Sequence, residues 1–286
     1  MAMTLPAEPL MLQRTARRQT GEAMASETKT AIVTGSNSGI GLGIARSLAA
    51  EGHNVVLNSY TDDETDHGLA KEIADANGNR AVYIKADLSK ADEARALVER
   101  AADRFGSVDI LVNNAGIQHV APVEEFPTGK WDAIIAINLS SAFHTAAVAV
   151  PMMKEKGWGR IVNIASAHGL TASPYKSAYI AAKHGIVGLT KTIALEFAEA
   201  RVAATCNAVC PGYVLTPLVE NQIEDQMKAH GMDRQDVLDK VMLQRQPTRE
   251  FATVEEMGGT VVFLCSDHAR QITGTTISVD GGWTAL

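Results

Sequence analysis

Thr34-Gly35-Ser36-Asn37-Ser38-Gly39-Ile40-Gly41 is a glycine-rich turn between a short β-branched run, residues 30–34, and a helical pattern that continues to about Glu51. Glycines let a backbone turn tightly and approach a ligand closely, and the N–H groups at the start of a helix bind anions. The strand, turn and helix together are therefore predicted to bind the pyrophosphate of a dinucleotide. The contacts are expected from Gly35, Ser38, Gly39, Ile40 and Gly41.

The alternation of short β-branched runs with longer helical patterns repeats along residues 29–286. This alternation is typical of a parallel sheet with helices on both faces. We therefore expect a single α/β domain, a Rossmann-like doubly wound parallel sheet. Its strands are expected near residues 30–34, 54–58, 81–86, 108–112, 160–165, 202–209 and 275–279.

Residues 216–248 interrupt this alternation with a polar, helix-prone insertion that follows the end of a strand. A segment in this position is predicted to form a helical lid over a substrate site. Beyond it, Thr253 and Glu256 have the spacing of a capping box, and they predict a helix that ends near Cys265.

The composition argues against several classes of partner. The 286 residues carry 26 basic and 33 acidic side chains, and no run of Lys or Arg could follow a phosphate backbone, so no nucleic-acid partner is expected. The odd number of cysteines, Cys206, Cys210 and Cys265, indicates buried thiols in a reducing compartment, and we expect a cytoplasmic protein. No metal site is expected.

Two segments need a separate interpretation. Residues 133–153 carry no charged side chain and have about the length of a membrane-spanning helix. Because this stretch contains Asn138, His144 and Pro151 and lies within the alternating pattern, we expect no membrane partner and a helix packed against the sheet or a neighbouring subunit. Residues 1–28 have no apolar periodicity and are expected to be a disordered leader, with Met24 as an alternative start.

The chemical centre is predicted at Tyr179-Ile180-Ala181-Ala182-Lys183, at the start of a helix after Pro174, because a spacing of four residues puts Tyr179 and Lys183 on one face. A nearby lysine cation favours the phenolate, which accepts a hydroxyl proton as hydride leaves for a nicotinamide. Ser166, at the end of the preceding strand, is placed to hold the substrate oxygen beside the tyrosine. The sequence therefore predicts a nicotinamide-dependent alcohol dehydrogenase or ketone reductase.

These motifs together resemble the short-chain dehydrogenase/reductase family over nearly all of residues 29–286. The resemblance implies a catalytic tetrad of Asn138, Ser166, Tyr179 and Lys183. In this tetrad Lys183 also contacts the nicotinamide ribose, and Asn138 holds a water that relays the proton. The resemblance implies a homotetramer as well. The further cofactor contacts that it implies come from Asp87, Leu88, Asn114, Ala115, Gly116, Pro211, Gly212, Val214 and Thr216.

The cofactor is expected to be NAD, because a 2′-phosphate needs a nearby Arg or Lys. Ser38 stands before Gly39, where phosphate-binding relatives often carry a basic residue, and the second strand ends in Asn58-Ser59-Tyr60-Thr61-Asp62. Neither segment offers a cation. No acidic residue stands directly at the end of that strand to bind the ribose, so the preference rests on the absence of positive charge.

Four polar residues at the expected rim of the site can bind a carboxylate: Gln118, His168, Lys176 and Gln222. The segments around them, residues 116–124, 165–170 and 211–219, resemble those of family members that oxidise D-3-hydroxybutyrate to acetoacetate. The resemblance implies that these four residues hold the carboxylate of a short 3-hydroxy acid. Tyr213 stands where some relatives carry tryptophan, and it is expected to line the same pocket.

Three other functions remain open from the sequence. A 3-oxoacyl thioester reductase that uses NADP shares the tetrad, although the missing basic residues near Ser38 argue against it. Another short-chain alcohol dehydrogenase is a second alternative. A non-catalytic protein that senses dinucleotides on this fold is the third, and the retention of all four tetrad residue types argues against it.

Overall fold

The computed structural model describes residues 28–285. The predicted leader therefore lies outside the described residues except for Thr28, and so does the alternative start at Met24. Within the described range the chain forms one seven-stranded sheet. Its strands are β1 (Thr30–Val33), β2 (Asn54–Leu57), β3 (Ala81–Tyr83), β4 (Ile110–Asn113), β5 (Trp158–Ile164), β6 (Ala203–Pro211) and β7 (Thr276–Val279).

All the strand pairs are parallel, in the order β3-β2-β1-β4-β5-β6-β7, so the doubly wound sheet is confirmed. The strands alternate with helices along the chain, as the sequence pattern predicts. The helices of the described range are α2 (Gly39–Ala50), α3 (Glu64–Asn77), α4 (Ala91–Phe105), α5 (Thr128–Ile135), α6 (Ser141–Lys156), α7 (Ser177–Glu199), α8 (Pro217–His230), α9 (Arg234–Val237) and α10 (Val254–Cys265).

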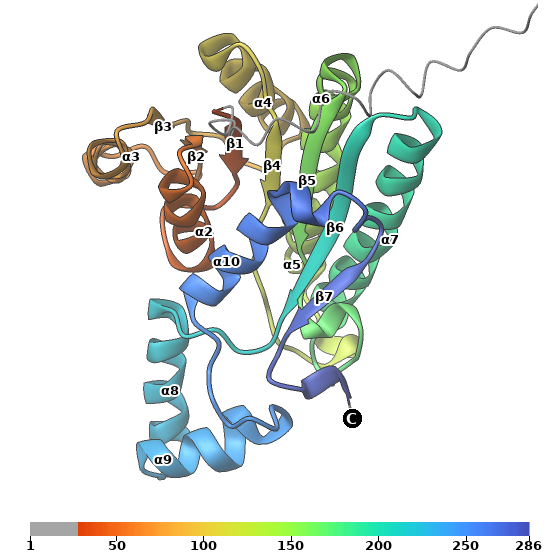
Figure 1. The fold of residues 1–286 in the computed structure, drawn as a ribbon. Helices are drawn as coiled ribbons and strands as arrows, with labels where there is room; N and C mark the ends of the chain where they lie inside the picture. The colour runs from red at the N-terminus through yellow and green to blue at the C-terminus, as the bar shows by residue number, and fades with distance from the viewer. Residues whose placement is uncertain (1–27, 286) are drawn as a thin grey trace, which may run out of the picture.

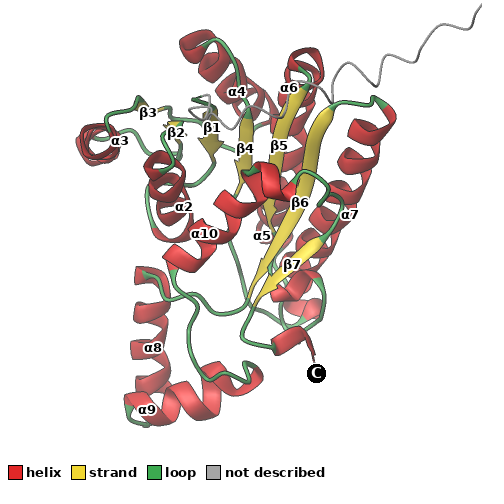
Figure 2. Cartoon of the chain, in the orientation of Figure 1, coloured by secondary structure: helices red, strands yellow, loops and turns green. Residues whose placement is uncertain are grey.

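Helices cover both faces of the sheet (Figures 1 and 2). One apolar core lies between the sheet and α2, α3 and α10, and the other lies between the sheet and α4, α6 and α7. Because both faces are covered, the residues of β1 and β4 are buried throughout. The predicted capping box of Thr253 and Glu256 is present, and the helix that it begins ends at Cys265.

The order of the strands reverses between β1 and β4, and a ligand crevice lies at this point in doubly wound sheets. The glycine turn follows β1, and the second predicted cofactor turn, residues 114–116, follows β4. The two turns are joined by Thr34, whose Oγ1 accepts the N–H groups of Asn114 at 2.9 Å and Ala115 at 3.1 Å. The side chain of Asn114 donates in return to the carbonyl oxygens of Thr34 and Gly35.

The insertion at residues 216–248 forms helices, as predicted, and it lies beyond the carboxyl edge of the sheet (Figure 1). The hydroxyl of Thr216 caps α8 by accepting the N–H of Val219 at 3.3 Å. Ile223, Val237 and Met242 are buried together in a small apolar cluster. After α9 the chain makes a π-helical turn, Leu238–Met242, and a 3₁₀ turn, Leu243–Arg245.

All seven strands differ from the prediction at one end or both, by one to three residues. The third strand ends at Tyr83 and not at Ala86. The N–H groups of Ile84 and Ala86 still bond to the backbone after β2, but their carbonyl oxygens accept from the side-chain amide of Asn58. The fourth strand begins at Ile110 and not at residue 108.

The long apolar segment forms a continuous helix, Thr128–Lys156, in which a π-helical turn, Ala136–Ser140, joins α5 to α6. Within the part of the chain that the structure describes, this is the one helix long and apolar enough to cross a membrane, with a mean hydropathy of 1.7. Its α6 part packs on the sheet as predicted. The opposite side remains open, since Phe143 is 51% exposed.

Gly41→Ala is expected to distort the glycine turn, because the added Cβ would lie 2.3 Å from the carbonyl oxygen of Gly35. The clash involves backbone, so we expect a destabilisation of about 1–3 kcal/mol and weaker dinucleotide binding. Thermal unfolding and a fluorescence titration with the dinucleotide measure the two effects.

Gly68→Ala is the matched control, since Gly68 also lies in a helix but its added Cβ would meet nothing within 4 Å. This change is expected to stabilise the protein by about 0.5–1 kcal/mol and to leave binding unchanged. Equal behaviour of the two variants would contradict the steric argument.

Candidate active site

The start of α2 provides an anion-binding end for the cofactor site. Its N-cap residue, Ser38, makes no side-chain capping hydrogen bond, and the first turn contains no acidic residue. The N–H groups of this turn therefore remain available to a ligand at the positive end of the helix dipole. Gly35 lets the two turns approach, since a Cβ there would lie 2.9 Å from the Cα of Ala115. These features fit a dinucleotide pyrophosphate.

The loop after β3 carries the predicted adenine contacts. Leu88 is buried there. The carboxylate of Asp87 accepts hydrogen bonds from the N–H and the hydroxyl of Ser89, at 3.0 and 2.7 Å, and pairs with Lys90 at 3.4 Å. Hydrogen bonding to Ser89 is the main cause of the lowered pKa of Asp87. The carboxylate is therefore held in a fixed, ionised position at the edge of the crevice.

The predicted contacts after β6 reach the same edge of the sheet. Pro211 ends β6, and the N–H of Gly212 bonds to the end of β7. Val214 is buried. Thr216 lies beside the glycine turn, since a Cβ on Gly39 would be 3.5 Å from its Cγ2. The chain therefore enters the helical insertion directly next to the start of α2.

A buried carboxylate lies behind the glycine turn. The side chain of Asn37 donates to Asp66 Oδ1 at 3.0 Å and to Thr61 Oγ1 at 3.3 Å, and Asp66 is only 3% exposed. Burial acts to raise the pKa of Asp66, but hydrogen bonds from Thr61 and Asn37 outweigh it and lower the pKa overall. The sequence analysis did not find this charge, because Asp66 lies in the first turn of α3 and not at the end of β2.

Tyr179 and Lys183 lie together in the first turns of α7, and Ser166 lies at the end of β5 beside them. The Ser166 hydroxyl is hydrogen-bonded to the Tyr179 side chain. The Lys183 Nζ lies 5.6 Å from the centroid of the Tyr179 ring and donates to the carbonyl oxygen of Ile164 at 2.7 Å. Three members of the predicted tetrad are therefore brought together by a strand end and a helix start.

Burial governs the acid-base properties of this group. It raises the pKa of Tyr179, while the hydrogen bond with Ser166 partly lowers it. It lowers the pKa of Lys183 to about 8, and this side chain is only 4% exposed. Lys183 thus keeps its proton at neutral pH and places a positive charge beside the phenol, which favours the phenolate.

Asn138 lies nearby, in the π-helical turn between α5 and α6. Its side-chain oxygen accepts the N–H of Ile117 and its amide group donates to the carbonyl oxygen of Ile117, both at 2.9 Å. The amide thus ties the loop after β4 to the long helix. Wide turns of this kind are frequent at functional sites, but the water-relay role of Asn138 stays a prediction.

A small cavity of about 180 Å³ lies beside this group. The His168 ring meets the Tyr179 ring edge to face, with centroids 6.1 Å apart, and meets Trp283 at 5.2 Å. Three predicted substrate residues, His168, Lys176 and Tyr213, line the cavity. The other lining residues are Ser173, Pro174, Val241, Met242, Gln244, Arg245 and Trp283.

The electrostatics of this cavity favour an anion. Burial lowers the pKa of His168 to about 4, with added repulsion from Lys176 and Arg245, so the imidazole is neutral near pH 7. Burial and Arg245 also lower the pKa of Lys176. No acidic side chain is among the described residues that line the cavity. A carboxylate would therefore relieve repulsion between cations there.

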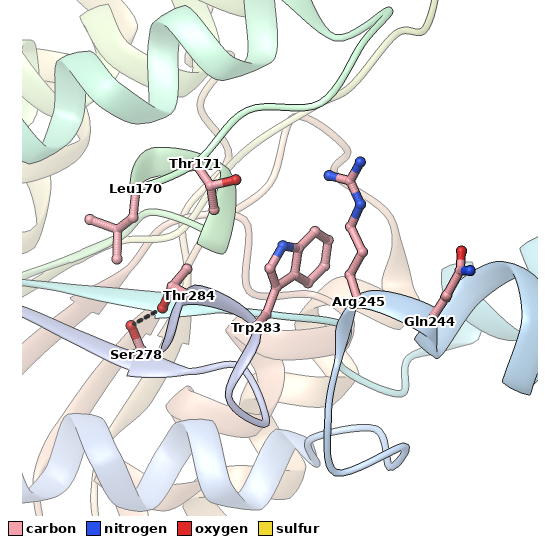
Figure 3. Close-up of a pocket in the computed structure, with 7 residues that line it drawn as sticks. All are labelled: Leu170, Thr171, Gln244, Arg245, Ser278, Trp283 and Thr284. Atoms are coloured by element: carbon pink, nitrogen blue, oxygen red, sulfur yellow. Dashed lines mark hydrogen bonds between the residues drawn. The ribbon is translucent and has the colours of Figure 1, made fainter. Parts of the chain in front are cut away.

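A wider cavity of about 760 Å³ adjoins the small one and shares Gln244, Arg245 and Trp283 with it (Figure 3). Its remaining lining residues are Leu170, Thr171, Ser278 and Thr284. Because three residues line both cavities, the two cavities lie side by side.

Comparison with known proteins assigns the chain to a family. Residues 35–284 match the model of a family described as enoyl-(acyl carrier protein) reductase. The D-beta-hydroxybutyrate dehydrogenase of Rhizobium meliloti is 56% identical over 258 residues, which cover 90% of this chain and 99% of that protein. This chain belongs to the short-chain dehydrogenase/reductase family.

Two further relatives show the range of the family. The D-beta-hydroxybutyrate dehydrogenase of Cupriavidus necator is 54% identical over 258 residues, covering 90% of this chain and 98% of that protein. A 3-oxoacyl-[acyl-carrier-protein] reductase of Staphylococcus aureus is 36% identical over 255 residues, covering 89% and 98%.

In this short-chain dehydrogenase/reductase the predicted substrate residues are not all brought together. Gln118 is exposed on the loop after β4, and Gln222 lies partly buried on α8; neither lines the two cavities. The structure instead places three residues there that the sequence analysis missed, Ser173, Arg245 and Trp283. The sequence did contain an indication that Trp283 lies near the site: it is one of three tryptophans in the chain, and it follows the end of a predicted strand.

Proposed function

We propose that this protein oxidises D-3-hydroxybutyrate to acetoacetate with NAD, in a reversible reaction. The observation that carries the proposal is the small cavity lined by Lys176 and a neutral His168, because the His168 ring also meets the Tyr179 ring, with centroids 6.1 Å apart. A short hydroxy acid needs a cation for its carboxylate and a base for its hydroxyl group at opposite ends of a small space. The two D-beta-hydroxybutyrate dehydrogenases support the assignment, because the matches cover nearly their whole length.

The tyrosine group performs the proton transfer. NAD, when bound, supplies the hydride acceptor. Ser166 holds the substrate oxygen, and the Tyr179 phenolate accepts the hydroxyl proton as the C–H bond breaks. Lys183, anchored on the carbonyl oxygen of Ile164, stabilises the phenolate before the transfer and reaches toward the cofactor ribose. In the reverse direction the Tyr179 phenol returns the proton to the carbonyl oxygen.

The carboxylate orients the substrate. A molecule of this size has too little apolar surface to bind by burial alone, so charge-assisted hydrogen bonds must hold it. Lys176 supplies the cation and His168 a neutral donor. Gln118 and Gln222 remain candidates for a contact only if the insertion and the loop after β4 move inward on binding.

The preference for NAD has support from the end of β2. The ionised Asp66 holds Asn37 of the glycine turn, and Asp62 and Asp63 lie on the same loop. These charges repel a 2′-phosphate at the place where the adenine ribose is expected. Asp62 lies 2.9 Å from the ring of His67, while Asp66 is buried behind the glycine turn.

Assembly and location complete the proposal. We propose a cytoplasmic homotetramer with no membrane and no nucleic-acid partner. Phe143 on α6 and Leu195 on α7 are 51% and 71% exposed, and such apolar helix faces suit a subunit contact. Cys206, Cys210 and Cys265 are free and buried, which suits a reducing compartment.

The alternatives fit the site less well. A thioester substrate is uncharged where a carboxylate would lie, so it would leave Lys176 and Arg245 without a counter-charge. A protein that only senses dinucleotides would not need a tyrosine, a lysine and a serine gathered beside a second cavity.

Tyr179→Phe is expected to reduce kcat by at least about 100-fold, because it removes the proton acceptor and almost no volume. Cofactor affinity, measured by quenching of protein fluorescence, should stay close to that of the parent. Lys183→Ala should lower both kcat and the affinity for the cofactor. Substantial activity in the Phe variant would show that another group is the base.

The parent enzyme is expected to prefer NAD over NADP by about 100-fold or more in kcat/KM, a difference of about 3 kcal/mol. Asp66→Asn should narrow this ratio, because it removes a buried charge without changing shape. Asp75→Asn, on the exposed side of α3, is the control. An equal efficiency with both cofactors in the parent would reject the charge argument.

Lys176→Ala is expected to reduce kcat/KM for D-3-hydroxybutyrate by about ten- to 100-fold, the loss expected for one charge-assisted hydrogen bond. The methyl ester of the substrate, which has no charge, should be used poorly by the parent and be little affected by the substitution. Steady-state rates with both compounds give the comparison. Equal use of acid and ester by the parent would rule out a carboxylate site.

A further inference from the structure

A chain of hydrogen bonds connects the helical insertion to the substrate cavity. Arg245, in the 3₁₀ turn of the insertion, donates from Nη1 to Ser173 Oγ at 2.8 Å and to the carbonyl oxygen of Ala172 at 3.3 Å. Ser173 Oγ lies 2.9 Å from Nε2 of His168. His168 is 6% exposed and faces the cavity beside Tyr179.

The direction of these bonds follows from the chemistry of the three groups. A guanidinium has only donors, so Ser173 Oγ must accept from Arg245. The hydroxyl has one hydrogen, and within the described part of the chain His168 Nε2 is the remaining side-chain partner of Oγ. Donation from a cation polarises the hydroxyl and makes it a stronger donor. The polarised hydroxyl is therefore a better donor than acceptor toward Nε2, which favours the unprotonated form of that nitrogen.

We propose that Ser173 is a positioning residue, which, held by Arg245 of the insertion, fixes His168 as the Nδ1–H tautomer and so turns a donor toward the substrate carboxylate. This inference rests on the proposed function only in naming the carboxylate as the ligand. Among residues 28–285 no hydrogen bond is made by Nδ1, so an N–H there still needs an acceptor, which we assign to the carboxylate.

The opposite tautomer would work against binding. With the proton on Nε2, Nδ1 would present a lone pair to an anion, and the contact would change from attraction to repulsion. Protonation does not remove the choice, because burial lowers the pKa of His168 to about 4 and the ring stays neutral near pH 7. Only the partner of Nε2 decides which form the ring takes.

The position of Arg245 adds a link to the insertion. Arg245 and Ser173 are 72 residues apart in the chain, and their contact exists only where the insertion lies against the loop before α7. Removing that contact takes away the cation that polarises the hydroxyl, so Ser173 Oγ accepts a hydrogen bond from an Nε2–H group more readily. The tautomer of His168 therefore indicates whether the insertion is packed against the loop before α7.

Solid-state ¹⁵N NMR of the full-length protein labelled at histidine tests the tautomer directly, because the two ring nitrogens differ strongly in shift when one is protonated. The chain has eight histidines, so the His168 signals are assigned by their loss in His168→Gln. We expect an Nδ1–H ring in the parent and in Ser173→Thr, which keeps the hydroxyl. Ser173→Ala should move population to Nε2–H, and Arg245→Met should do so in part.

Kinetics supply the second readout. Ser173→Ala should raise KM for the acid by about three- to tenfold with a smaller change in kcat, and leave the methyl ester unaffected. Ser173→Thr should recover most of the loss. Thr192→Val removes a hydroxyl from the exposed face of α7, outside the chain of bonds and the lining of both cavities, and it should behave like the parent. Thermal unfolding shows that each variant is folded.

The outcomes separate the two hypotheses. An Nε2–H ring in the parent, or an unchanged His168 spectrum in Ser173→Ala, overturns the positioning role whatever the substrate is. A parent that shows the Nδ1–H ring but does not distinguish acid from ester supports the tautomer and contradicts the proposed function.

Discussion

A single buried hydroxyl, that of Thr34, holds the carboxyl edge of the sheet together. It lies at the end of β1, accepts the N–H groups of Asn114 and Ala115, and donates to the carbonyl oxygen of Val112 at 3.4 Å. The two turns that it joins consist largely of small residues, which offer little side-chain packing of their own. The side chain of Asn138 then extends the same scaffold by binding the backbone of Ile117, so the long helix Thr128–Lys156 is positioned relative to the loop after β4.

The proposed chemistry of the site depends on the positive charge of Lys183, which burial disfavours. Lowering the pKa of Lys183 from 10.5 to about 8 corresponds to about 3 kcal/mol against the charged form. A neutral side chain of the same shape would avoid this cost, but it would not stabilise a phenolate. The sheet around β5 is fully packed and supplies the carbonyl oxygen of Ile164 at a fixed place, so the lysine cannot escape to solvent. The local loss of stability therefore places a cation beside Tyr179, the base that we propose.

The sequence predicted the parts of the molecule that are encoded locally. Each strand, the capping box of α10 and the spacing of Tyr179 and Lys183 depend on neighbours within one element, so periodicity was sufficient. At β3 the prediction ran too far, because the carbonyl oxygens of Ile84 and Ala86 accept from the Asn58 side chain and not from a backbone N–H.

The lining of the substrate cavity depends instead on contacts between distant segments. Arg245 reaches Ser173 only after the insertion has packed on the loop before α7, and no local pattern marks either residue. Asp66 acts on the glycine turn through Asn37 for the same kind of reason. Gln118 and Gln222 failed to reach the cavity because polarity at a loop indicates accessibility, while the direction of a side chain is decided by packing.

Because two cations, Lys176 and Arg245, line the small cavity, the stability of the protein depends on the concentration of small anions in solution. Lys176 and Arg245 face a space with no acidic residue in its described lining, so the empty protein carries unrelieved repulsion. Any small anion that binds there stabilises the folded state in proportion to the logarithm of its concentration. A cell rich in such anions would thus lengthen the lifetime of the folded protein without any separate regulator.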